Sequence, residues 1–149
     1  MTPLTRIGAL ASALAFGMAL ATASHAMSRE EYKAGKDRIA ADYKSAKAGC
    51  ATFSGNAKDI CIAEAKGNEK VAKAELEAVY APSGKHRYDV NVAKADAEYA
   101  VAKEKCDDKA GNDKKVCLKE AKAAEVTAIS DAKANMKTSE ARNDASSKG

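Results

Sequence analysis

Apolar residues recur every three or four positions along most of the chain after residue 26. The clearest stripe follows steps of 4, 3, 4, 3 and 4 and consists of Tyr88, Val92, Ala95, Tyr99, Ala102 and Cys106. The same steps occur earlier in the chain, with Lys36 as the one polar member, at Tyr32, Lys36, Ile39, Tyr43, Ala46 and Cys50. Because residues three and four apart share one side of an α-helix, each stripe predicts a helix with one buried face that ends at a cysteine.

A Gly-Asn pair follows each stripe, and a second helical segment follows each pair. Glycine tolerates the left-handed conformation that closes a helix, and Asn can accept hydrogen bonds from the free N–H groups of the next helix, at Gly55-Asn56 and Gly111-Asn112. The second segments carry apolar positions that can face back onto the first helix, namely Ile60, Cys61, Ala65, Ala72, Leu76 and Val79, and then Val116, Cys117, Ala121, Ala128 and Ala132. The pattern predicts two antiparallel helical hairpins.

The two hairpins are copies of one unit, offset by 56 residues. Cys106 follows Cys50 at this offset and Cys117 follows Cys61, and further matches are Tyr32 with Tyr88, Tyr43 with Tyr99, and Glu64-Ala-Lys66 with Glu120-Ala-Lys122. A fixed period of this kind indicates a duplicated supersecondary element.

We therefore expect an all-α protein of two tandem disulfide-stapled hairpins, with their packing as a four-helix bundle left open. The expected segments are hairpin 1 at 27–80, a hinge with Pro82 and Gly84 at 81–87, hairpin 2 at 88–136, and a polar tail that frays at 137–149.

The spacing of the cysteines predicts how they pair. Cys50 lies five residues before Gly55, and Cys61 lies five residues after Asn56, so antiparallel helices would bring the two cysteines level. Ala-rich helices can approach to about 8 Å, which brings facing Cα atoms within the roughly 4.4–6.8 Å that a disulfide needs. Of the three possible pairings, we therefore predict Cys50–Cys61 and Cys106–Cys117.

The first 26 residues differ in composition from the rest of the chain. Arg6 is their only charged side chain, an apolar run follows from Ile7 to Ala21, and Ser24-His-Ala26 supplies the small residues that signal peptidase accepts. We expect a cleaved signal peptide at 1–26, no stable membrane insertion after cleavage, and a periplasmic location in which the cysteines oxidise.

Charge and composition narrow the classes of function. After Arg6 is removed, 24 Lys and Arg stand against 21 Asp and Glu, a net charge of +3, and the two signs are interspersed. A nucleic-acid binder concentrates its basic residues on one face, so we expect no nucleic-acid partner. With no Trp and only Phe53 after the signal, the core is small, and disulfides would offset that deficit.

The residues for catalysis are missing from the pattern. After the signal the chain has one histidine, His86, which lies in the hinge. The four tyrosines of the two stripes fit packing between helices better than ligand binding, namely Tyr32, Tyr43, Tyr88 and Tyr99. Structural zinc sites space two cysteines two to four residues apart, and redox pairs use Cys-x-x-Cys, whereas ten residues separate each pair here. We expect no enzyme, no catalytic or metal residues and no cofactor.

The prediction is a structural or interaction protein of the bacterial envelope, whose partner is an unknown envelope protein. The alternatives are a binder of anionic envelope polymers or lipids through Lys-rich helix faces and, second, a metal-binding protein.

The duplicated Cys-x10-Cys unit, its central Gly-Asn and the Glu-Ala-Lys after the second cysteine resemble a group of small, secreted proteobacterial Ala/Lys-rich proteins, some of them labelled TolA-like by composition. The resemblance covers the chain after the signal. It implies a periplasmic location and helical repeats, and no functional residue can be carried over from it.

Overall fold

The computed structural model describes residues 26–148, and the predicted signal peptide lies outside them except for Ala26. The described part holds four α-helices and no strand: α1 (Arg29–Gly49), α2 (Gly55–Tyr80), α3 (Gly84–Cys106) and α4 (Gly111–Ser146), with a short 3-10 turn, η1 (Cys50–Thr52), after α1. The all-α prediction and the two helical hairpins are confirmed, with α1 and α2 in the first hairpin and α3 and α4 in the second.

Local sequence signals explain where the helices begin. The Ser28 hydroxyl accepts from the Glu31 N–H, and the Glu31 carboxylate accepts from the Ser28 N–H, which together form a capping box. The Ser83 hydroxyl caps α3 by accepting from the His86 N–H at 3.0 Å. Gly55 and Gly111 have φ values of +56° and +55°, so their predicted left-handed conformation is confirmed. They were expected to close the first helix of each hairpin, which was wrong, because each begins the second helix.

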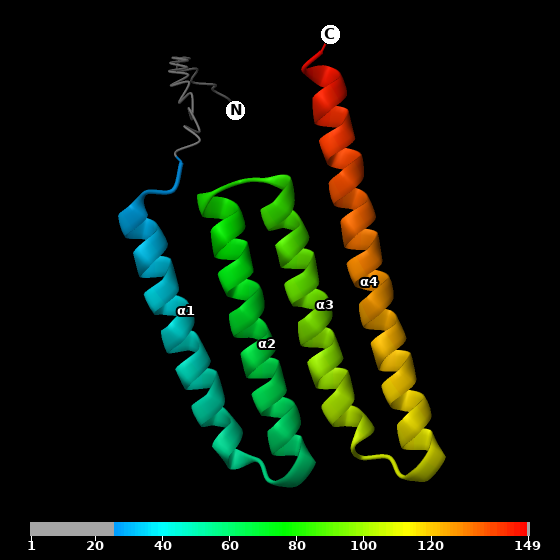
Figure 1. Cartoon of the computed structure of the whole chain (residues 1–149). Coiled ribbons are helices and arrows are strands. Elements are labelled where there is room, and N and C mark those ends of the chain that lie inside the picture. The colour runs from blue at the N-terminus through cyan, green and yellow to red at the C-terminus, as the bar shows by residue number, and fades with distance from the viewer. Residues whose placement is uncertain (1–25, 149) are drawn as a thin grey trace, which may run out of the picture.

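The four helices lie side by side in one row, in chain order (Figure 1). Among the described residues α1 packs only on α2, α2 also packs on α3, and α4 packs only on α3. The two hairpins are therefore joined through α2 and α3, which answers the packing question that the sequence left open. The result is an open layer and not a closed four-helix bundle, because α1 and α4 do not meet.

An open layer leaves little interior. The buried apolar residues are small and lie along the lines where helices touch, at Cys50, Ala63, Ala65, Ala93, Ala95, Cys106 and Ala132. The predicted stripe of the second hairpin is confirmed, since all its members are buried or half-buried. In the first hairpin Ala46 and Lys36 are exposed.

Three residues predicted to face the first helix of their hairpin are exposed, namely Val79, Val116 and Ala128. Val79 is 59% exposed and Val116 is 44% exposed. In a single layer each helix keeps two sides in solvent, and a helix at the end of the row keeps a third. Only positions on the contact lines are covered, so a broad apolar stripe overestimates what is buried.

Two predicted boundaries also differ from the structure. Helix α3 begins at Gly84, inside the expected hinge at 81–87, so only three residues separate α2 from α3. Helix α4 runs to Ser146, so most of the tail expected to fray at 137–149 is helical. No Gly or Pro interrupts the sequence between Asn112 and Lys148. In this tail the hydroxyls of Thr138 and Ser139 donate back to the carbonyls of Ala134 and Met136, and they leave the helix intact.

Candidate functional site

Both predicted disulfides are present. The Cα atoms of Cys50 and Cys61 are 5.6 Å apart, and those of Cys106 and Cys117 are 5.7 Å apart. Cys50 and Cys106 are fully buried, and their partners are half-buried. With no cysteine left free, a zinc site built from cysteine thiolates is excluded in this state. Within residues 26–148 no group of three or more His, Cys, Asp or Glu side chains is arranged to hold a metal ion.

The turn of the first hairpin is tied to the second hairpin by Asn56. Its side-chain amide donates to the carbonyl oxygen of Glu104, in the last turn of α3, at 2.7 Å. That carbonyl lies at the end of α3 and also accepts from the N–H of Asp107 at 3.0 Å, so the Asn56 amide gives it a second hydrogen bond. The sequence predicted that Asn56 would cap its own helix, which was wrong. The side chain instead fixes the register between the hairpins at their disulfide end.

Helices α2 and α3 approach closely at Gly67. A Cβ atom at this position would lie 2.8 Å from the Cβ of Ala97 and 3.3 Å from its Cα. These distances are too short for a side chain, so the close approach requires glycine. A groove lies between the two helices on either side of this contact.

The two grooves lie on opposite faces of the layer. One, of about 380 Å³, is lined by charged side chains that include Asp59, Lys66, Lys70 and Glu104. The other, of about 430 Å³, is lined by Glu64, Asn68, Glu98 and Lys105 among others. Gly67 and Ala97 line both grooves, and charged side chains surround this shared floor.

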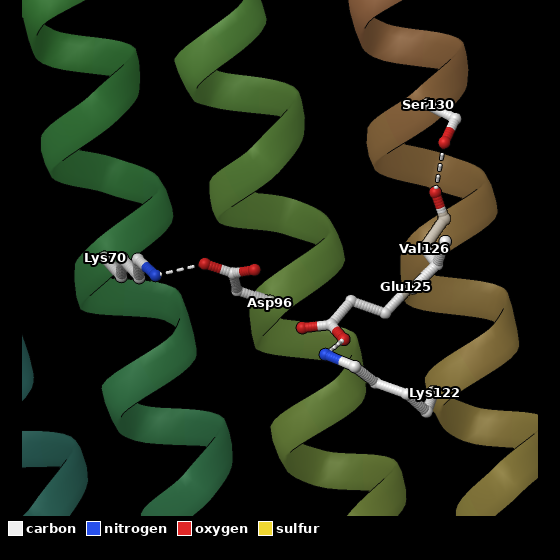
Figure 2. A network of polar contacts seen from close by, with 6 residues as sticks. All are labelled: Lys70, Asp96, Lys122, Glu125, Val126 and Ser130. Carbon is white, nitrogen blue, oxygen red and sulfur yellow. Dashed lines mark hydrogen bonds and ion pairs between the residues drawn. The ribbon is translucent and has the colours of Figure 1, made fainter.

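Ion pairs cross the interface between the hairpins. Lys70 of α2 points to Asp96 of α3 and pairs with it (Figure 2). Lys94 of α3 pairs with Glu75 of α2 at 2.8 Å. Asp96 is half-buried and the other three side chains are exposed, so each pair contributes at most about 1 kcal/mol and acts mainly to set the register.

The tyrosines pack between helices, as predicted. Tyr32 stacks on Tyr80 with ring centroids 4.3 Å apart, and its hydroxyl donates to the Glu77 carboxylate. This hydrogen bond raises the pKa of the Tyr32 hydroxyl. Together these contacts close the end of the first hairpin that is remote from its disulfide.

His86 and Lys122 take part in local contacts. A ring nitrogen of His86 contacts the carbonyl oxygen of Ala81, next to the start of α3. Lys122 bonds to Glu125 on α4 (Figure 2), and this bond raises the pKa of the Lys122 ammonium group. Lys122 also lies 5.0 Å above the ring of Tyr99. Glu125 is the one buried charged residue of the described part.

The sequence held a signal for the interface between the hairpins that the stripes alone do not reveal. Helices α1 and α3 are equivalent in the repeat, yet α3 must cover two neighbours and α1 only one. At the α2-facing positions of α3, Ala93 and Ala100 replace Asp37 and Lys44 of α1. Comparing the two copies position by position would have exposed this second buried face.

In comparisons with known proteins, no family model, no curated protein and no solved structure matches the chain. None of the helices at residues 26–148 combines the length and the apolar character needed to cross a membrane. The two disulfides are compatible with an oxidising, extracytoplasmic compartment.

Proposed function

We propose that this chain is a non-enzymatic interaction module of the bacterial envelope, exported by the signal peptide at 1–26 and stapled in the periplasm. The observation that supports the proposal is the open layer. Four helices in one row offer two broad faces and two edges to partners, whereas the interior holds mainly alanine and cysteine side chains. Such a layer is a rigid display surface. The two disulfides stabilise this layer although the chain is short and its core is small.

The test is site-specific photocrosslinking in the periplasm of the producing bacterium. A photoreactive residue replaces an exposed side chain on one face at a time. Examples are Asn68, in the groove that Glu64 lines, and Lys66, in the groove on the other face that Asp59 lines. We expect a discrete cross-linked partner from one face and not from the other. Crosslinks that are equal on both faces and unaffected by loss of both disulfides would contradict a defined interaction surface, as would turnover of a substrate by the purified protein.

A second candidate function is the binding of anionic envelope material by lysine-rich faces. Exposed lysines supply the supporting observation, because several of those on α4 are in no ion pair within the described residues. Retention on anionic vesicles or lipopolysaccharide at low salt, lost at high salt, is the expected result. No retention at low salt would remove this function.

A further inference from the structure

Helix α4 occupies one end of the row, with α3 on one side and solvent on the other (Figure 1). Its solvent side carries one narrow stripe at steps of 4, 7, 7 and 4 residues, formed by Lys115, Lys119, Val126, Lys133 and Lys137. These steps keep the five side chains on one side of an α-helix, and all five are exposed. We call this set the α4 edge.

The repeat shows that the charge of the α4 edge is specific to this copy. The equivalent positions of α2 and the residue after it are Asp59, Ala63, Lys70, Glu77 and Ala81, which hold two acids and one lysine. On α4, Lys115 and Lys133 stand where α2 has the two acids. The α4 edge therefore holds four positive charges and no negative one. Helix packing alone requires no such charge.

The lysines of the α4 edge are available to a ligand. Within the described part of the chain Lys115, Lys119, Lys133 and Lys137 form no ion pair, whereas Lys122, which lies nearer to α3, bonds to Glu125. Between Lys115 and Lys137 the acidic residues Glu120 and Asp131 lie about a third of a turn round the helix from the stripe, whereas Glu140 and Asp144, which follow Lys137, lie close to its line. The outer side of α4 is therefore cationic from Lys115 to Lys137, and acidic residues follow this segment.

Apolar side chains stand among these lysines. Val116 and Val126 are 44% and 51% exposed, and both face away from α3. Between Lys115 and Lys137 the stripe extends about 33 Å at the usual helical rise, which is long enough to span several lipid headgroups. A cluster of four or more lysines on one side of a helix is attracted electrostatically to a membrane surface that carries anionic headgroups.

The geometry points to the α4 edge as a docking site for a membrane surface rich in anionic phosphate headgroups, with its four lysines on the phosphates and its valines at the headgroup boundary. Charge complementarity selects this occupant, and the exposed valines favour a lipid surface over a soluble polyanion. The inference rests on the second proposed function and assigns it to one edge of the layer.

The test uses the oxidised full-length mature chain and sedimentation with vesicles of phosphatidylcholine alone or of equal parts phosphatidylcholine and phosphatidylglycerol. The edge variant changes Lys115, Lys119, Lys133 and Lys137 to Gln. The matched control changes the four exposed lysines of α1, Lys33, Lys36, Lys44 and Lys47, to Gln, which removes the same net charge. Circular dichroism and disulfide mapping check that both variants keep the fold.

We expect the wild-type protein to bind only the anionic vesicles. The edge variant should lose on the order of a hundredfold in affinity, and the α1 control should lose less than about fivefold. A third variant, Val116→Ser with Val126→Ser, should weaken binding to vesicles and leave binding to dextran sulfate, a soluble polyanion, unchanged.

Other outcomes would show which part of the proposal is wrong: the site on α4, the binding of anionic material or the choice of a lipid surface. Equal losses in the edge variant and the α1 control would overturn the assignment to α4, while anionic binding itself would stand. Absence of any binding by the wild-type protein would overturn the second proposed function together with the site. Binding to neutral vesicles of equal strength, or no effect of the valine changes on vesicles, would overturn the choice of an anionic lipid surface.

Discussion

Gly67 is the residue on which the contact between the two hairpins depends most directly. Replacing it with Ala would place a methyl group 2.8 Å from the Cβ of Ala97 and force α2 and α3 apart. We expect Gly67→Ala to lower the free energy of unfolding by about 1–3 kcal/mol, measured by urea denaturation. Gly49 is the matched control, since a Cβ there meets nothing within 4 Å and its φ of −59° suits alanine. Gly49→Ala should be neutral or stabilise by up to about 1 kcal/mol. A neutral or stabilising effect of both changes would contradict the close α2–α3 approach.

Asn56 gives a second test at the scale of single residues, because the repeat supplies its own control. Asn56→Ala removes the hydrogen bond to the Glu104 carbonyl and should cost about 1 kcal/mol of stability. Asn112 is the equivalent residue of the second hairpin, is exposed, and has no helix beyond α4 to contact. Asn112→Ala should therefore leave the denaturation midpoint nearly unchanged. Equal effects of the two substitutions would show that Asn56 acts within its own turn.

At the scale of helices, the disulfides should matter differently for the two ends of the row. Each closes a segment of the same length, with a sequence separation of 11, so loss of either should cost about 3 kcal/mol by loop-closure entropy. Helix α1, however, contains no buried residue, whereas α4 buries Glu125 and Ala132 against α3.

Changing Cys50 and Cys61 to Ser should therefore release α1 from the layer. In hydrogen exchange we expect the amides of α1 to lose most of their protection while α3 and α4 keep theirs. Changing Cys106 and Cys117 to Ser should leave α4 partly protected through its packing on α3. Full protection of α1 after loss of Cys50–Cys61 would show that packing alone holds that helix.

The elements were predictable from the sequence where a local pattern carried the information. The stripes, the cysteine spacing and the 56-residue offset correctly predicted the hairpins and both disulfides. The arrangement of the hairpins was not predictable in this way, because it depends on contacts between copies, such as Gly67 with Ala97 and Asn56 with Glu104. The stripes likewise treated Val79 and Val116 as buried, since a periodic pattern cannot tell how many neighbours a helix will have.

At the scale of the whole molecule, the ends of the row are built differently from its middle. Suppose that α4 of one copy packed on α1 of another copy as α2 packs on α3. Lys119 and Lys44 would then occupy the positions at which Ala63 and Ala100 line the groove between α2 and α3. Ala123 would also stand in place of Gly67. Like charges and the added methyl group both oppose such a contact, so the row should not extend by adding further copies.

We therefore expect the mature protein to be monomeric at micromolar concentration in multi-angle light scattering. The combined variant Lys44→Ala, Lys119→Ala and Ala123→Gly restores the small residues of the inner interface and should associate in a concentration-dependent way. A wild-type protein that already forms chains of copies, or a variant as monomeric as the wild type, would contradict this explanation of the edges.

Both hairpins depend on how the cysteines pair, and this pairing can be mapped in the protein purified from its producing cells without reductant. Trypsin cuts after Lys58 and Lys109, between the two cysteines of each predicted pair, so each disulfide joins separate peptides in non-reducing mass spectrometry. We expect Cys50 to be linked only to Cys61, and Cys106 only to Cys117. A peptide in which Cys50 is joined to Cys106 or Cys117 would contradict the two stapled hairpins.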